Sequence, residues 1–178
     1  GLPLKPERKI EFETDEGTWL ALDVSPDGET IIFELLGDIY TMPAAGGEAT
    51  ALITGMGFQS QPNYSPDGKN ITFLSDESGA ENVHDVGIDG KSPRKLTSLI
   101  GSEVLSPEWS ADSQYIYVSQ NKSGIGAMGL WMYHKDGGKG IEVIKTKETP
   151  DTPRNRENNI MGVSASSDGR YLYYAKKQ

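Results

Sequence analysis

The sequence predicts an all-β chain that forms part of a β-propeller. The tetrapeptide "SPDG" occurs at residues 25–28 and 65–68, and degraded copies, "SADS" and "SSDG", occur at residues 110–113 and 166–169. The copies begin 40, 45 and 56 residues apart, and a period of about 40–45 residues is typical of propeller blades. After each copy comes a short run of β-branched and aromatic residues whose length suits a strand.

Turn geometry explains the repeated tetrapeptide. Pro fixes φ at about −65°, Gly supplies a positive φ, and the Ser hydroxyl bonds the turn backbone. Such a turn joins two antiparallel strands. The other interpretation of the four aspartates, a ring of carboxylates that binds cations, is not needed, because turn chemistry alone favours Asp there. The structural turn motif comprises Ser25, Pro26, Asp27, Gly28, Ser65, Pro66, Asp67, Gly68, Ser110, Asp112, Ser166, Asp168 and Gly169.

Each repeat continues with a third strand, a second turn and a fourth strand. The second turn contains glycine in "AAGG" (44–47), "IDGK" (88–91) and "KDGG" (135–138), and strand-like runs follow it. One unit is therefore strand, SPDG turn, strand, loop, strand, glycine turn, strand. This order predicts four-stranded antiparallel blades.

The chain is predicted to be one partial propeller domain, residues 1–178, of about three and a half blades plus an N-terminal closing strand. Propellers usually close with about 4–8 blades, so roughly half of a ring is expected. The predicted parts are blades near 18–54, 58–98 and 103–146, an incomplete blade at 160–178, a polar insertion loop at 147–159 and the closing strand "RKIEFET" at 8–14.

Composition excludes several classes of function. The net charge is −9 without a basic stretch, which argues against nucleic acid and anionic membrane surfaces as partners. There is no cysteine, so disulfides, thiol nucleophiles and Cys-based zinc sites are excluded. No apolar run approaches the ~18 residues of a membrane helix, and no membrane insertion is expected.

No motif in the chain predicts a catalytic, cofactor-binding or metal-binding residue. "GIGAMG" at 124–129 matches G-x-G-x-x-G, but a strand follows it where a dinucleotide site needs a helix, so a hairpin loop is expected. His84 and His134 lie 50 residues apart, unlike the usual zinc spacings. His84 aligns with Tyr40 and Trp131, which favours a packed ring. No Gly-x-Ser-x-Gly nucleophile elbow occurs.

The repeats resemble the WD40-like blades of the TolB β-propeller family. That family's pattern runs approximately Pro-x-Trp-Ser-Pro-Asp-Gly, an apolar strand, Ser-Asp, Ile-Tyr, Gly-Gly and Leu-Thr. The chain supplies "PNYSPDGKNITFLSDESG", "GDIYTMPAAGGEATALIT" and "PEWSADSQYIYVSQ". In addition, "TDEGTWLALDVSPDG", "LLGDIYTMPAAGGEAT" and "GLWMYHKDGG" resemble the N-terminal propeller of exported TolB-related amidohydrolases. The departures are His84, where an aromatic residue is usual, and the third copy of the turn, which lacks Pro and Gly.

The resemblance implies a non-catalytic propeller that serves a metal-dependent hydrolase domain as a scaffold, substrate-access or interaction domain. A divalent metal is implied only for that hydrolase domain, and no cofactor is expected in this chain, which should hydrolyse nothing by itself. The implied partners are the missing propeller half and the hydrolase domain, and the implied location is periplasmic or secreted. Two alternatives stay open: a stand-alone TolB-like interaction module of the cell envelope, and the propeller of a prolyl-oligopeptidase-type serine peptidase.

Two further expectations concern surfaces. An open half-ring exposes apolar blade faces and unpaired strand edges, so self-association is predicted. The insertion at 147–159 has three possible roles: contact with the hydrolase domain, gating of the central channel, or a solvated loop that the fold tolerates.

Overall fold

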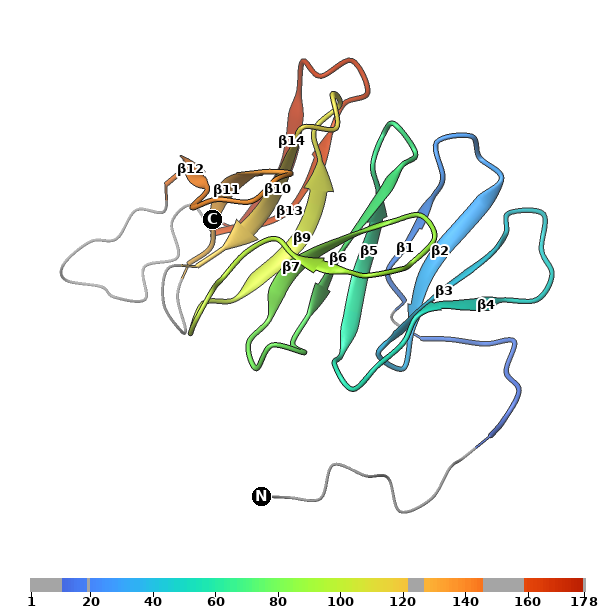
Figure 1. Cartoon of the computed structure of the whole chain (residues 1–178). Helices are drawn as coiled ribbons and strands as arrows, with labels where there is room; N and C mark the ends of the chain where they lie inside the picture. Colours follow the sequence, from blue (N-terminus) through green and yellow to red (C-terminus); the bar gives the residue numbers. More distant parts are fainter. Residues whose placement is uncertain (1–10, 19, 122–126, 146–158, 178) are drawn as a thin grey trace, which may run out of the picture.

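The computed structural model describes residues 11–18, 20–121, 127–145 and 159–177, and it contains only strands, turns and loops in these segments. Three four-stranded antiparallel sheets and one two-stranded sheet follow one another in chain order along an arc (Figure 1). The first strand of each sheet contacts the first strand of the next. This is a partial β-propeller, as the sequence predicts. Among the described residues, no helix has the length and apolar character needed to span a bilayer.

Each four-stranded sheet is a simple meander, in which every strand pairs with its neighbours in sequence. The fourth sheet has two strands within the described residues. The strands are β1 (Leu22–Val24), β2 (Thr30–Leu35), β3 (Asp38–Pro43) and β4 (Thr50–Ile53) in the first sheet; β5 (Gln59–Tyr64), β6 (Asn70–Ser75), β7 (Asn82–Gly87) and β8 (Arg94–Lys95) in the second; β9 (Val104–Trp109), β10 (Tyr115–Gln120), β11 (Gly129–His134) and β12 (Ile141–Ile144) in the third; and β13 (Asn159–Ala165) and β14 (Leu172–Lys177) in the fourth.

The SPDG turns join the first two strands of every sheet with one hydrogen-bond pattern. In the first copy, the Ser25 hydroxyl donates to Asp27 Oδ1 at 2.6 Å and accepts the Thr30 backbone N–H at 2.9 Å. Asp27 Oδ1 also accepts the Glu29 N–H at 3.0 Å, and Gly28 has a φ of 76°. The same Ser–Asp, Asp–backbone and Ser–backbone bonds occur in the other three turns.

Apolar residues at alternate strand positions fill the spaces between sheets. In β6, Phe73 packs toward the first sheet and its neighbour Leu74 toward the third, because successive side chains of a strand point to opposite faces. Trp109 of β9 is almost completely buried between the second and third sheets. Full burial of one such side chain stabilises the fold by about 1.5–3 kcal/mol, so these apolar contacts between neighbouring sheets help to hold the blades together.

Three predicted segments differ from the structure or lie partly outside the described residues. Of the expected closing strand at 8–14, residues 8–10 lie outside the described residues, and residues 11–14 form no strand. A strand needs a hydrogen-bonded neighbour, and no described strand lies beside this segment. The insertion at 147–159 lies outside the described residues except for Asn159, which already begins β13. Residues 124–126 of "GIGAMG" also lie outside them, and its last residue, Gly129, begins strand β11.

Candidate functional site

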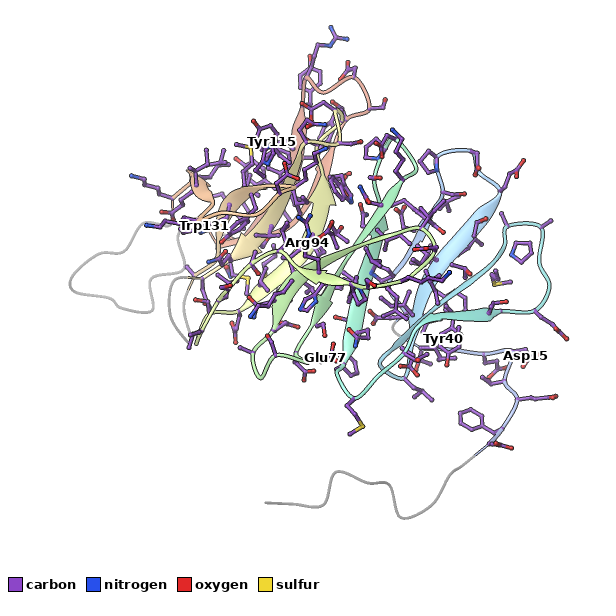
Figure 2. The ribbon with its side chains drawn as sticks, in the orientation of Figure 1. Asp15, Tyr40, Glu77, Arg94, Tyr115 and Trp131 are labelled. Carbon is purple, nitrogen blue, oxygen red and sulfur yellow. The ribbon has the colours of Figure 1, made fainter. Side chains whose placement is uncertain are left out.

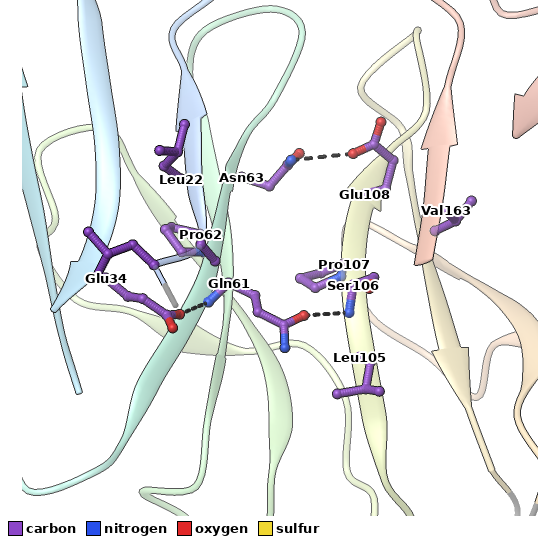
Figure 3. A pocket seen from close by; sticks show the side chains of 12 residues that line it. Leu22, Glu34, Gln61, Pro62, Asn63, Leu105, Ser106, Pro107, Glu108 and Val163 are labelled. Atoms are coloured by element: carbon purple, nitrogen blue, oxygen red, sulfur yellow. Dashed lines mark hydrogen bonds between the residues drawn. The ribbon is translucent and has the colours of Figure 1, made fainter. Parts of the chain in front are cut away.

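A cavity of about 450 Å³ lies along the inner strands, where the propeller axis would run. We call it the channel cavity (Figure 3). Its walls come from β1, β5, β9 and β13, with Glu34 of β2 at one side. Gln61, Asn63, Ser106 and Glu108 supply its polar side chains, and prolines and leucines fill the space between them.

The inner strands bulge at one shared position, four residues before the serine of the turn. Gln61 has a φ of 51°, Ser106 of 54° and Gly162 of 76°, and the strand register shifts beside each of them. A bulge adds a residue and locally bends the strand. A left-handed conformation costs a non-glycine residue roughly 1–2 kcal/mol, so Gln61 and Ser106 need compensating contacts.

Side chains from the preceding sheet supply those contacts. Glu34 Oε2 accepts the backbone N–H of Gln61 at 2.5 Å, and Gln61 Oε1 accepts the N–H of Ser106 at 2.7 Å (Figure 3). Closer to the turns, Asp23 Oδ2 accepts the N–H of Tyr64 at 2.7 Å. A hydrogen bond to a charged acceptor such as Glu34 contributes about 1.5–3 kcal/mol and one to a neutral acceptor such as Gln61 about 0.5–1.5 kcal/mol, which is comparable to the strain of each bulge.

Glu108 connects three sheets within the channel cavity. One carboxylate oxygen accepts the Ala165 N–H at 2.9 Å and the Ser164 hydroxyl at 3.3 Å, and the other accepts Asn63 Nδ2 at 3.3 Å. Burial raises the pKa of Glu108, and the hydrogen bonds from Ala165 and Ser164 oppose part of that rise. The result is a partly desolvated carboxyl group in the wall of the cavity, bonded to donors from the second and fourth sheets.

The inner-strand residues were missed by the sequence predictions. Asp23, Asn63, Glu108 and Ser164 all stand two residues before the turn serine, so aligning the residues upstream of SPDG shows a polar position in every repeat. Glu34 carries no comparable signal, because its partner Gln61 lies 27 residues away in the chain.

The predicted turn residues lie at one end of the sheets and do not line the channel cavity. Their four aspartates stay apart, each bonded within its own turn. The serine hydroxyl bond lowers the pKa of all four carboxyls, Asp27, Asp67, Asp112 and Asp168. Within the described residues, no group of three or more His, Asp or Glu side chains is arranged to hold a metal ion.

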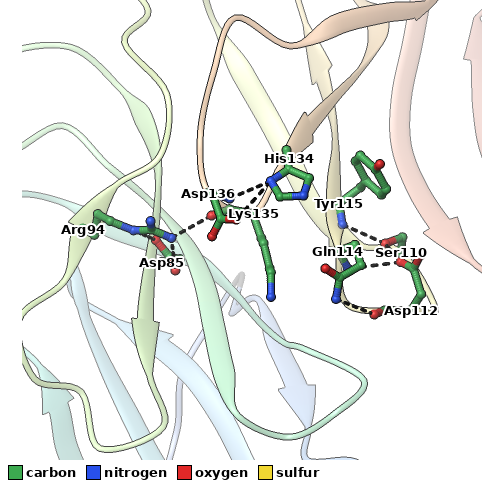
Figure 4. A network of polar contacts seen from close by, with 9 residues as sticks. All are labelled: Asp85, Arg94, Ser110, Asp112, Gln114, Tyr115, His134, Lys135 and Asp136. Carbon is green, nitrogen blue, oxygen red and sulfur yellow. Dashed lines mark hydrogen bonds and ion pairs between the residues drawn. The ribbon is translucent and has the colours of Figure 1, made fainter.

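The two histidines occupy separate, structural positions. His84 is 7% exposed, and its ring centroid lies 5.5 Å from that of Phe73, its cross-strand partner. Burial lowers the pKa of His84, and its Nε2 atom is buried without a hydrogen-bond partner. His134 lies in β11, where Nδ1 accepts the Asp136 N–H at 3.2 Å and the ring meets Tyr115 edge-on at 5.3 Å (Figure 4).

A polar network joins the second and third sheets at their outer rim. Arg94 of β8 binds both carboxylate oxygens of Asp85, at 2.9 and 3.0 Å, and donates to the Lys135 carbonyl at 2.6 Å (Figure 4). The side chain of Arg94 is half exposed. This arrangement therefore ties two blades together and offers no reactive group.

The sequence matches the family described as the Tricorn protease N-terminal beta propeller domain over residues 21–177. The chain belongs to this propeller family. An uncharacterized protein of Agrobacterium fabrum is 35% identical over 100 residues, which cover 53% of this chain and 34% of that protein. The Tol-Pal system protein TolB of Bordetella pertussis is 41% identical over 56 residues, which cover 31% of this chain and 13% of TolB. The chain thus spans about a third or less of these relatives.

Solved propellers share the fold. The structure of TolB from Acinetobacter baumannii matches 89% of this chain and 38% of its own, with a TM-score of 0.68 and 16% identity. A puromycin-hydrolyzing peptidase of Mycobacterium tuberculosis matches 85% of this chain and 25% of its own, with a TM-score of 0.60 and 15% identity. The prediction of a TolB-like propeller is confirmed by these comparisons together with the family match.

Proposed function

We propose that this chain is the non-catalytic propeller part of a larger exported hydrolase of the amidohydrolase kind. In that protein it supports the hydrolase domain and admits or selects substrate along the channel cavity. The observation that carries the proposal is the channel cavity itself, a polar opening of about 450 Å³ on the inner strands. The described residues around it offer hydrogen-bond acceptors such as Glu108 but no nucleophile paired with a base, which fits a role in access rather than in chemistry.

A serine peptidase is the second candidate for the parent protein. The family name refers to a protease, and the Mycobacterium tuberculosis peptidase shares the fold. The TolB similarity supports a third candidate, a stand-alone interaction module. The sequence contexts around residues 14–28 and 35–50 favour the amidohydrolase by resemblance.

The proposed partners are the remaining blades of the ring and the hydrolase domain, and the proposed location is the periplasm or the exterior of the cell. The resemblance to exported TolB-related proteins supports this location. Fractionation of cells that express the complete gene tests it, and recovery of the protein only from the cytoplasm would contradict it.

Narrowing the channel cavity tests the access role. Val163 lines the cavity, and Val163→Trp adds a large ring there. In the full-length protein we expect this variant to lower kcat/KM for bulky amide substrates and to leave small amide substrates almost unaffected. The matched control is Val143→Trp on β12, which lies outside the cavity lining and is 45% exposed. Equal kinetics of the two variants on both substrate sizes would refute the access role.

Assays of the same full-length protein distinguish the three candidate parent proteins. Loss of hydrolysis in a metal chelator supports the amidohydrolase, covalent labelling by a fluorophosphonate supports the serine peptidase, and the absence of any hydrolysis supports the interaction module. The chain of 178 residues by itself is expected to hydrolyse none of these substrates.

A further inference from the structure

We propose that the end of the sheets opposite the SPDG turns is a docking surface for a basic, amphipathic segment of a partner polypeptide. The surface is formed by Phe12, Leu36, Met56 and Phe58, which we call the end patch. It is separate from the channel function, because Phe12, Leu36, Met56 and Phe58 do not line the channel cavity.

The antiparallel topology places these side chains at one end. The segment before β1, the β2–β3 turn and the β4–β5 loop all lie opposite the SPDG turns, as Figure 1 shows. Leu36 is 77% exposed, Met56 74%, Phe12 63% and Phe58 58%. Single exposed apolar residues are common on protein surfaces, but a contiguous group of them marks an interaction site.

Three residues of the end patch lie around one cavity, and one of them is held in place. Phe12, Leu36 and Phe58 line a second cavity, of about 500 Å³. The Phe58 ring lies against Gly37, where an added Cβ would approach its Cδ2 atom to 3.0 Å. The Phe58 N–H donates to Asp76 Oδ1 at 2.7 Å. An apolar side chain on a fixed backbone is a preorganised anchor, which limits the entropy lost on binding.

The conformation of Leu36 sets it apart from an ordinary exposed leucine. Leu36 and Gly37 form a two-residue hairpin turn, with φ angles of 55° and 87°. Turns with two positive φ angles favour Asn-Gly, and a leucine there is both strained and in contact with water. Because the turn does not require this side chain and 77% of it is exposed, it is available for contact with another molecule.

Charge identifies the kind of partner. No Lys or Arg occurs from residue 11 to residue 68, and the segment before β1 carries four acidic residues, Glu11, Glu13, Asp15 and Glu16. Figure 2 labels two acidic residues of this end, Asp15 and Glu77. An apolar patch with an acidic rim attracts a segment that combines apolar side chains with Lys or Arg. An anionic lipid surface has the wrong sign of charge, so a polypeptide is the favoured occupant.

Binding of a model ligand by the full chain tests the proposal. The probe is a synthetic amphipathic helix of Leu and Lys, and its Kd is measured by calorimetry at low and high salt. We expect Leu36→Asn and Phe58→Ser each to weaken binding about tenfold, as loss of a hot-spot side chain does, and high salt to weaken binding further. Leu36→Asn should not lower Tm, since Asn suits the turn, so its loss of binding cannot come from misfolding.

Ile88→Asn is the matched control, because Ile88 is 55% exposed at the opposite end; it should bind as the wild type does. Wild-type affinity of both Leu36→Asn and Phe58→Ser would overturn the proposal. So would equal binding of a helix of Leu and Glu, which would show that charge plays no part. Binding to anionic lipid vesicles that Leu36→Asn abolishes would overturn it in favour of a membrane.

Discussion

Ser113 holds a backbone conformation that the other three turns give to glycine. Its φ is 57°, close to the 76° of Gly28 and the 68° of Gly68 and Gly169. The serine has one contact that glycine lacks: its Oγ atom accepts the backbone N–H of Asp67, in the neighbouring sheet, at 3.1 Å. At Ser113, the strain of a left-handed non-glycine residue is therefore accompanied by a hydrogen bond between two blades.

Two substitutions of Ser113 separate the cost of its backbone strain from the contribution of its hydrogen bond to Asp67. Ser113→Ala keeps the strain and loses the bond, so it should lower the free energy of unfolding by about 1 kcal/mol. Ser113→Gly loses the same bond but relieves about 1 kcal/mol of strain, so it should be nearly neutral. Urea denaturation of both variants measures the difference. Equal stability of the two variants would show that the strain at this residue is negligible.

His84 makes stability depend on pH. Burial lowers the pKa of His84 below its usual 6.5, so the unfolded chain takes up a proton at a higher pH than the folded one does. Stability is therefore lost as the pH falls below 6.5. The His84→Phe variant lacks this loss, and its advantage over the wild type should grow between pH 7.5 and pH 5, as followed by urea denaturation. An advantage that does not change over this range would contradict the assignment.

At the scale of the element, the inner strand is the feature that organises the site. Each of β5, β9 and β13 shifts register near a left-handed residue, and in β5 and β9 the N–H of that residue binds an acceptor from the sheet before it. The bend directs polar side chains such as Glu108 toward the channel cavity. The bulged inner strands therefore supply both the hydrogen bonds between neighbouring sheets and the wall of the channel cavity.

The pH dependence of stability tests whether Glu108 is buried in the channel cavity as described. Its pKa is raised by burial, so folding favours its protonated form, and its contribution to stability falls as the pH rises above 4.5. Glu108→Gln keeps an acceptor for the Ala165 N–H and does not titrate. Its stability relative to the wild type should improve from pH 4.5 to pH 7. A constant difference, measured by thermal unfolding, would mean that Glu108 is solvated like an ordinary surface carboxylate.

The sequence predicts the elements better than the site. The SPDG copies predict where the first hairpin of each sheet lies, because the hydrogen bonds and the positive φ that form this turn involve residues close together in the sequence. The bulge at Gln61 could not be predicted, because its acceptor is Glu34 in another sheet. Glu108 stands at the polar position two residues before the turn serine, but its partners come from the sheets on both sides, so that position alone does not show what Glu108 binds.

At the scale of the whole molecule, the arc leaves two outer faces without a neighbouring sheet among the described residues. Leu22 and Val24 are exposed on the first sheet, and Met161 and Tyr173 on the fourth, where β14 pairs only with β13. Where two neighbouring sheets of the arc face each other, the equivalent faces bury apolar side chains against one another. In the longer protein proposed above, the remaining blades would cover both faces.

The chain alone is predicted to self-associate through these faces. Sedimentation equilibrium should give a mass that rises with concentration, and Tyr173→Lys should shift it toward the monomer, since Tyr173 is 62% exposed on the last strand. Lys139→Tyr, in the loop after β11, is a control that should leave the mass unchanged. A monomer mass at every concentration would refute this prediction.

The inner-strand bonds also make each sheet depend on its neighbour. Asp23 and Glu34 accept from Tyr64 and Gln61, and Glu108 accepts from Ala165. The bonds from Asn63 to Glu108 and from Asp67 to Ser113 run in the opposite direction along the chain. A polar group that loses its partner between two sheets costs free energy, so the unfolding of one blade would destabilise the next, and the blades are expected to unfold together in one cooperative transition.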